Sequence, residues 1–217
     1  MQRRHRTPLL MPSVIFEMKI NGKSIIRHSI SAINSVIKDF HENPFIFLYE
    51  SDIQFALFSA LRERINGNVE VPRTEGNKYV LNLVYSEYLD KIDIVCIDPE
   101  EVSKLDPASL KQYKGYDTYI YNLPVLLGIE LKYVWMGYKK GLNILKRDFL
   151  KLRTSPKIGK IKNWVVLGFI QRNEEADSLL KDPDNQWRLS LITSVDHINN
   201  IYIITPSEIY TAHLKSH

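Results

Sequence analysis

The sequence has almost no cysteine and no long apolar run. Among 217 residues there is one cysteine, Cys96, which excludes a disulfide within the chain and a zinc site built from several cysteines. No apolar run approaches the roughly 20 residues needed to cross a bilayer. The basic N-terminus also lacks the apolar segment and the cleavage site of a secretory signal. We therefore expect a soluble, cytoplasmic protein with no membrane partner.

Low-complexity sequence is absent as well, and the composition is that of an ordinary globular domain. Hydrophobic residues make up 44% of the chain and charged residues 25%, values that suit a domain with a substantial core rather than a disordered chain. We find no internal repeat and no Gly/Ser-rich linker. The length favours one domain over two, so we expect a single domain over residues 1–217.

Basic residues are in small excess over acidic ones, and they are unevenly distributed along the chain. The chain holds 29 Lys+Arg and 25 Asp+Glu, a net charge of +4. Residues 139–162 contain nine basic residues and one acid, so this segment alone carries +8. Such a run forms either a solvated face or a surface that contacts phosphates. The candidate nucleic-acid-binding residues within it are Lys146, Arg147, Lys151 and Arg153.

Hydrophobic periodicity predicts a chain of alternating helices and strands. Apolar steps of three and four indicate helices, and alternation or short apolar runs indicate strands. We expect helices at about 24–40, 49–65, 106–113 and 139–152, a short one after Asn173, and a last one opened by Thr205-Pro206-Ser207-Glu208. We expect strands at about 14–20, 69–71, 79–88, 91–97, 123–131, 164–170, 189–192 and 201–204. This order predicts an α/β fold with a mixed β-sheet flanked by helices.

Four ionisable residues occupy places that the pattern reserves for apolar side chains. Asp93 interrupts an apolar strand, and Glu50 lies on the apolar face of the helix at 49–65. Glu130 and Lys132 end another apolar strand and, being two residues apart, leave it on the same face. An ionised group near a core costs several kcal/mol unless it is paired or holds a metal. Together the four residues indicate a functional site.

Each of these residues also has an ordinary structural interpretation. Asp93 can pair with a neighbouring lysine or cap a turn, and Asp90 and Asp98 compete with it for a metal. Glu50 can be an acid favoured by the helix dipole alone. A second Glu-x-Lys occurs at Glu17–Lys19 on the polar side of a predicted strand, so the tripeptide by itself decides nothing.

In combination, the motifs resemble the signature of the PD-(D/E)XK nuclease superfamily. That signature consists of a helix glutamate, a strand aspartate and a Glu-x-Lys on the next core strand, which correspond here to Glu50, Asp93 and Glu130-Leu131-Lys132. The resemblance covers about residues 49–171. Ile92 replaces the proline of the motif, and the 36 residues between the aspartate and the glutamate imply an insertion.

The resemblance implies a restriction-endonuclease-like core and a DNA endonuclease that depends on Mg²⁺, for which Mn²⁺ can substitute. Asp93, Glu130 and Glu50 would hold the metal, and Lys132 would orient the attacking water or stabilise the charged phosphate. The four basic residues of segment 139–162 would grip the DNA backbone. By analogy the enzyme would be a homodimer, either a structure-selective nuclease of the Holliday-junction-resolvase type or a restriction-like or repair nuclease.

A non-catalytic alternative is a nucleic-acid-binding protein on the same nuclease fold. In that case the basic segment keeps its role and the acids are structural remnants. Lys151 can also simply pair with Asp148 on an exposed helix face. Nothing in the sequence distinguishes DNA from RNA as the partner.

Overall fold

The structure is a computed structural model, and it describes most of the chain. The described residues are 20–72, 78–88, 92–105, 123–134, 147, 161–171 and 187–214. Several predicted elements fall outside them: the strand at 14–20 except its last residue, the helix at 106–113, the helix at 139–152 except Arg147, and the helix after Asn173.

Two predicted helices are confirmed with small shifts at their ends. Helix α1 spans Gly22–Glu42 and begins where the Asn21 side chain accepts a hydrogen bond from Ser24 N at 2.9 Å. Helix α2 spans Glu50–Arg64, after the short 3₁₀ helix η1 at Pro44–Ile46. Helix α2 buries the apolar residues spaced at four that predicted it, whereas α1 buries Ile33, Ile37 and Phe40 of its predicted stripe and leaves Ile26 and Ile30 half-buried. Amphipathic packing rather than helix propensity alone holds both helices in place.

The main sheet has seven strands in the order β3-β4-β5-β6-β8-β9-β7. The bounds of its strands are Val84–Tyr88 (β3), Ile92–Ile97 (β4), Val125–Val134 (β5), Ile161–Ile170 (β6), Trp187–Ile192 (β7), Asn200–Ile204 (β8) and Ile209–Leu214 (β9). Strands β5, β6 and β8 run parallel and the other pairs are antiparallel. The sheet is therefore mixed, and with its helices the chain is a mixed α/β protein, as the sequence predicted.

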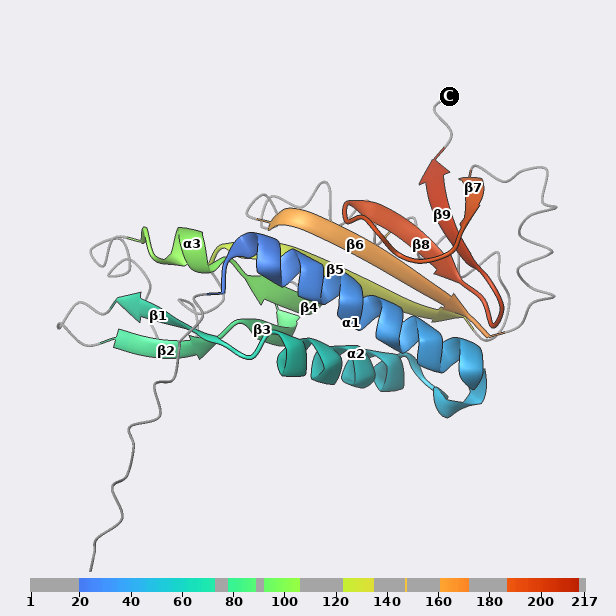
Figure 1. Cartoon of the computed structure of the whole chain (residues 1–217), viewed down its shortest axis with the longest axis horizontal. Helices are drawn as coiled ribbons and strands as arrows, with labels where there is room; N and C mark the ends of the chain where they lie inside the picture. Colours follow the sequence, from blue (N-terminus) through green and yellow to red (C-terminus); the bar gives the residue numbers. More distant parts are fainter. Residues whose placement is uncertain are drawn as a thin grey trace, which may run out of the picture.

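A separate two-stranded ribbon extends from the end of the main sheet where α3 lies (Figure 1). It pairs β1 (Asn68–Pro72) with β2 (Lys78–Asn82). The short helix α3 spans Pro99–Val102. The prediction of one strand over 79–88 is therefore wrong: the chain leaves the ribbon and enters the main sheet at Leu83. Apolar and aromatic residues recur through both strands and Leu83 between them, so the pattern does not mark the change of sheet.

Three further expectations require correction. Helix α3, opened by Asp98-Pro99, was not predicted. Strand β5 continues to Val134, so Glu130 and Lys132 lie within the strand rather than at its end. The segment opened by Thr205 is a turn, not a helix: its hydroxyl accepts from Glu208 N at 3.0 Å and leads the chain from β8 into β9. The same side-chain bond caps a helix or closes a turn, and the apolar residues that follow favour a strand.

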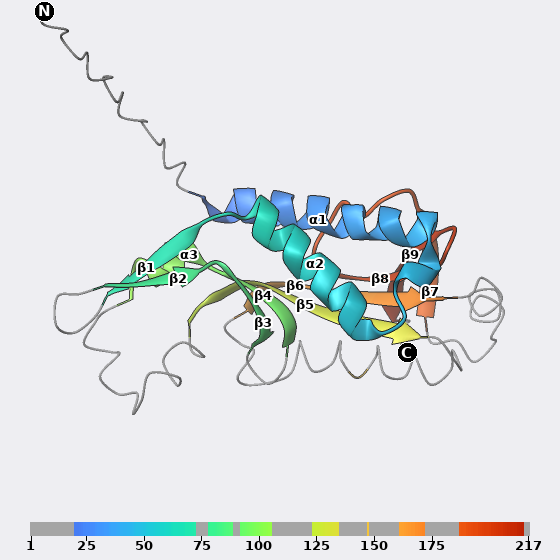
Figure 2. The same cartoon turned by 90° about the horizontal axis from the view of Figure 1, so that it is seen from below.

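Helix α1 covers one face of the main sheet (Figures 1 and 2). Ser29 lies 3.8 Å from Cys96 of β4, and the ring of Phe40 packs edge-on against Phe169 of β6. Cys96 is fully buried, as the sequence predicted of a core residue, and this burial raises the pKa of its thiol to about 12. Because alternate residues of a strand point to opposite faces, Glu130 and Lys132 lie on the face away from α1.

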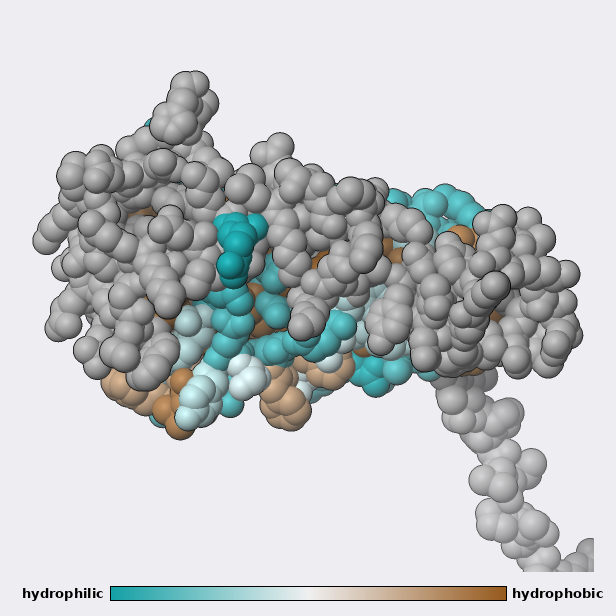
Figure 3. All heavy atoms as spheres, turned by 180° about the vertical axis from the view of Figure 1, so that it is seen from behind, coloured by the Kyte–Doolittle hydropathy of each residue, from teal (hydrophilic) through white to brown (hydrophobic). Residues whose placement is uncertain are grey.

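Apolar side chains are exposed along η1 and the start of α2. They gather at the lower edge of the view in Figure 3, and five of them are more than half exposed: Phe45, Ile46, Leu48, Tyr49 and Phe55. This strip directly adjoins Glu50 in the chain. Among the helices that the structure describes, none combines the length and apolar character required to cross a bilayer.

Candidate active site

Asp93 and Glu130 come together from neighbouring antiparallel strands. Ile94 of β4 pairs with Ile129 of β5, so the next position outward sets Asp93 across from Glu130. Side chains across an antiparallel pair share a face, with Cβ atoms about 5 Å apart. The two residues therefore occupy neighbouring positions on one face of the sheet, and both are nearly buried, at 9% and 2% exposure.

Lys132 joins this pair from the same strand and connects it to helix α2. Its ammonium lies 2.7 Å from Oε1 of Glu50, with the two side chains 22% and 35% exposed. Glu50 is the first residue of α2. The apolar stripe of α2 packs the helix on the sheet, and this packing brings a residue 82 positions away in the sequence to Lys132.

Carboxylates occupy the edge of β5 beyond its pairing with β4. Leu131 N donates to Asp93 Oδ2 at 2.6 Å, and Tyr133 N donates to Glu50 Oε2 at 3.1 Å. Tyr133 also donates its hydroxyl proton to the carbonyl of Phe47 at 2.8 Å. These two backbone N–H groups, two residues apart on the same edge of β5, would otherwise bond to a neighbouring strand. The carboxylates of Asp93 and Glu50 accept from them instead, and this fixes both carboxylates along β5.

The environment of Asp93 opposes its ionisation. Burial above all, together with the nearby charges of Glu50 and Glu87, raises the pKa of this carboxyl from 3.8 to about 6, although the Leu131 N–H and the Lys132 ammonium act in the other direction. A carboxylate kept in such surroundings is typical of sites that hold a cation or move a proton.

Two residues that the sequence argument missed adjoin Asp93. Gln54 lies one helical turn after Glu50, and its amide donates to Asp93 O at 3.0 Å and to Glu87 Oε1 at 3.1 Å. Glu87 has a positive φ of 52°, a conformation that is uncommon outside glycine and often marks functional sites. The spacing of four from Glu50 could have identified Gln54, but the backbone of Glu87 left no signal in the sequence.

No family model, no curated protein and no solved structure matches this chain. The comparisons therefore neither support nor contradict the family that the motifs resemble. The arrangement of Glu50, Asp93, Glu130 and Lys132 carries the functional argument, because all four predicted site residues converge on one place in the fold.

The donor set at this place suits a hard cation such as Mg²⁺. Mg²⁺ is usually bound through one or two carboxylates, with waters and substrate phosphates completing its six ligands. Asp93 and Glu130 provide two acids at neighbouring positions of adjacent strands. Within the described parts of the chain, no group of three or more His, Cys, Asp or Glu side chains could hold a metal ion, so a third protein ligand is not preformed there.

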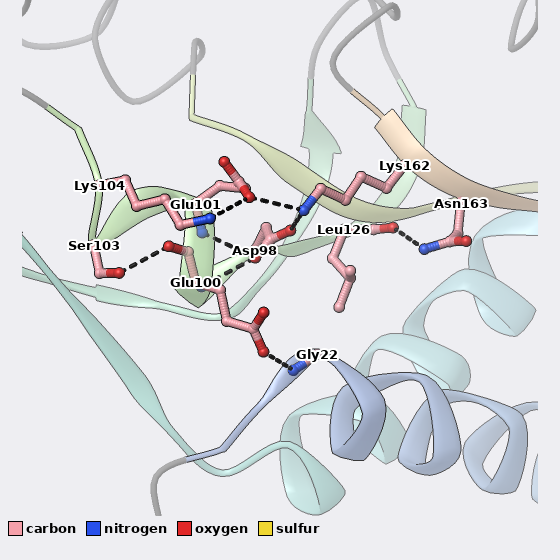
Figure 4. Close-up of polar contacts among 9 residues, drawn as sticks. All are labelled: Gly22, Asp98, Glu100, Glu101, Ser103, Lys104, Leu126, Lys162 and Asn163. Carbon is pink, nitrogen blue, oxygen red and sulfur yellow. Dashed lines mark hydrogen bonds and ion pairs between the residues drawn. The ribbon is translucent and has the colours of Figure 1, made fainter.

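A second group of acids and lysines lies at the other end of β4 (Figure 4). We call it the Asp98 cluster; its members are Asp98, Glu101, Lys104 and Lys162. Asp98 Oδ1 accepts from the backbone N–H groups of residues 100 and 101, and its Oδ2 lies 2.8 Å from Lys162 Nζ. Lys162 and Lys104 also bind Glu101, at 3.1 and 2.9 Å. Asp98 is thus a helix cap with an ion-pair partner rather than a rival metal ligand.

The predicted nucleic-acid-binding residues remain largely unplaced. Lys146, Lys151 and Arg153 lie outside the described residues. Arg147 is described, with helical backbone and an exposed side chain, in agreement with the helix expected over 139–152. Whether these cations lie near Asp93 is therefore a prediction that stays open to experiment.

Proposed function

We propose that the chain is a metal-dependent endonuclease that hydrolyses DNA phosphodiester bonds and belongs to the PD-(D/E)XK type. The observation that carries the proposal is the placement of two buried acids, Asp93 and Glu130, at neighbouring positions of adjacent antiparallel strands, with the acid-paired Lys132 beside them. The mixed sheet and the helix that presents Glu50 are in keeping with the resemblance. Phosphodiester hydrolysis needs an activated water and neutralisation of the charge that builds on the phosphate, and a bound metal ion beside a lysine can supply both.

Each residue has a distinct role in this proposal. Asp93 and Glu130 would hold Mg²⁺ or Mn²⁺, which when bound supplies Lewis-acid stabilisation of the phosphate charge and a more acidic water. Lys132 would orient the attacking water or stabilise the charge on the phosphate oxygens. Glu50 holds the Lys132 ammonium at 2.7 Å, so it would position the lysine and contribute to the metal site through a bound water.

Substrate binding in this proposal depends on the basic segment. Apart from Lys162, which is paired with Asp98 and Glu101, the cations of residues 139–162 would supply phosphate contacts through Lys146, Arg147, Lys151 and Arg153. These contacts weaken as the salt concentration rises, because release of counterions from the DNA is then less favourable. We also propose that the enzyme acts as a homodimer, since cutting both strands of a duplex or a junction calls for two sites. Light scattering of the purified chain with and without DNA measures that stoichiometry.

The decisive experiment is a cleavage assay on a panel of nucleic acids. Purified protein is incubated with Mg²⁺ or Mn²⁺ and plasmid, duplex, flap and four-way-junction DNA, with RNA of matched sequence alongside. Asp93→Asn and Lys132→Met are assayed in parallel, and Lys162→Met serves as the matched control because it also removes an acid-paired lysine. We expect cleavage by the parent and the control and none by the two site variants.

The alternatives predict different results on the same panel. Binding without cleavage across all substrates would support a nucleic-acid-binding protein and would sink the nuclease proposal. Equal cleavage by parent, Asp93→Asn and Lys132→Met would indicate a contaminating nuclease. Preferential cutting of junctions over linear duplex would assign the structure-selective type, and cutting of RNA alone would change the substrate class.

A further inference from the structure

The backbone of β3 and β4 is irregular beside Asp93. The register passes from the pair Ser86–Ile94 directly to Tyr88–Ile92 and skips the pair of Glu87 with Asp93 in these described strands. The skipped position coincides with the positive φ of Glu87. An irregularity in an otherwise continuous ladder needs a local cause and a replacement for the lost partner.

The carbonyl of Asp93 is directed toward β3. Ile97 N donates to Leu83 O at 2.8 Å, which shows that Ile97 turns its backbone polar groups toward the β3 side of β4. In an antiparallel ladder alternate residues turn these groups to the same neighbour, so Val95 and Asp93 do the same. The regular donor for the Asp93 carbonyl would be Glu87 N.

Gln54 provides a donor at this carbonyl. Its half-buried side chain reaches from α2, and Nε2 lies 3.0 Å from Asp93 O and 3.1 Å from Glu87 Oε1. One amide thus connects α2, β3 and β4 at the residue that would hold the cation. Both protons of the amide are used, because the carbonyl and the carboxylate are acceptors.

We propose that Gln54 is a positioning residue of the candidate site, whose bond to the Asp93 carbonyl holds that residue's carboxylate beside Glu130 for a divalent cation. The inference rests on the proposed nuclease function and adds a residue to it. Gln54 acts through the main chain of Asp93 and touches neither cation nor substrate. Loss of outer groups that orient metal ligands typically weakens metal affinity 10–100-fold.

The test compares metal binding among four proteins. Gln54→Met keeps the length of the side chain and removes the donor. The double variant Gln54→Glu with Glu87→Gln reverses the side-chain pair, so it restores that bond but leaves the Asp93 carbonyl without its donor. Asn34→Leu is the matched control, because Asn34 is an amide that connects α1 to the backbone of Val195 at 2.7 and 2.9 Å, away from Asp93.

Mn²⁺ affinity is measured by electron paramagnetic resonance titration of each full-length protein without nucleic acid, and the Mg²⁺ concentration for half-maximal cleavage is measured separately. We expect about tenfold weaker Mn²⁺ binding for Gln54→Met and for the double variant, with unchanged affinity in Asn34→Leu. Unfolding temperatures identify any variant that fails to fold. If Gln54→Met fails to fold, the double variant still tests the inference, because it retains the bond between α2 and β3.

Two results would overturn the inference while leaving the nuclease proposal intact. One is parental Mn²⁺ affinity in a folded Gln54→Met protein that still requires Asp93 for cleavage. The other is full recovery in the double variant, which would assign the role to the Gln54–Glu87 bond. A parent that neither binds Mn²⁺ nor cleaves any substrate overturns both proposals together.

Discussion

The two ends of β4 carry clusters of the same residue types in opposite physical states. At one end, one carboxylate oxygen of Asp98 accepts hydrogen bonds from two backbone N–H groups of α3, and the other oxygen lies 2.8 Å from the Lys162 ammonium. At the other end Asp93 shares its surroundings with Glu50 and Glu87, and its pKa is raised to about 6. Five positions of the chain thus separate an acid that caps a helix and pairs with a lysine from an acid with an unfavourable charge.

The difference shows how a structural and a functional acid can be told apart. An acid that serves stability is placed where its charge is favourable, at the start of a helix and beside a lysine. An acid whose folded environment disfavours its charge weakens the fold, so its presence calls for a compensating role such as metal binding. Variants at both ends of β4 can test this contrast directly.

The largest expected contrast is in catalysis. Lys132→Met should lower the cleavage rate at least about 100-fold, because removal of one group that stabilises the charge of the transition state typically costs about 10²–10³ in rate. Lys162→Met should retain the parental rate, since its ammonium is committed to Asp98 and Glu101. Single-turnover rates on the preferred DNA give the comparison. Equal losses in the two variants would mean that the lysines support the fold alone.

The next contrast is in stability against pH. The folded pKa of Asp93, about 6, exceeds its usual 3.8, so the folded chain binds this proton more tightly than the unfolded chain. The contribution of this proton to the free energy of unfolding is therefore intact below pH 3.8 and is lost as the pH rises to about 6, with a total loss of about 3 kcal/mol. Asp93→Asn should accordingly be more stable than the parent at neutral pH by about that amount.

Urea denaturation of the parent and Asp93→Asn at about pH 4 and pH 8 measures this effect. The two proteins should be close in stability at the lower pH and separate at the higher one. Asp98→Asn is the control and should show no gain at pH 8. A parent–variant difference that is independent of pH would contradict the unfavourable ionisation of Asp93.

A smaller effect of opposite sign is expected at the other end of the strand. Asp98→Ala removes the cap of α3 and the partner of Lys162 from a buried position, and loss of such a cap costs up to about 2 kcal/mol. Cleavage per folded molecule and Mn²⁺ affinity should be unchanged. Chemical denaturation together with Mn²⁺ titration gives both values; weaker Mn²⁺ binding in Asp98→Ala would make Asp98 part of the metal site.

The sequence could predict the site residues because their chemistry is local to each element. Glu50 lies on the apolar stripe of a helix and Asp93 inside an apolar strand, so each conflicts with its own pattern. The register that brings Asp93 beside Glu130 depends on the pairing of Ile94 with Ile129, 35 positions apart, which no local pattern encodes. The positive φ of Glu87 leaves no signal in the sequence, and the interaction of Gln54 with Asp93 and Glu87 depends on it. The Thr205 turn uses the same side-chain bond as a helix cap, so the sequence alone does not separate a turn from a helix start there.

The smallest expected effect lies at the exposed edge of the Asp98 cluster. Glu101 binds both Lys104 and Lys162, and these two lysines lower the pKa of its carboxyl. The Lys104 side chain is 67% exposed, and exposed ion pairs contribute little to stability. Lys104→Ala should therefore leave the unfolding temperature unchanged in low and in high salt, because Lys162 remains on Glu101 and the buried cap at Asp98 is untouched. A clear, salt-sensitive drop in the unfolding temperature would instead mean that the surface ion pairs, rather than the buried Asp98 carboxylate, stabilise this end of the sheet. Asp98 and Asp93 would then differ in how exposed their surroundings are and not in whether their charges are stabilised.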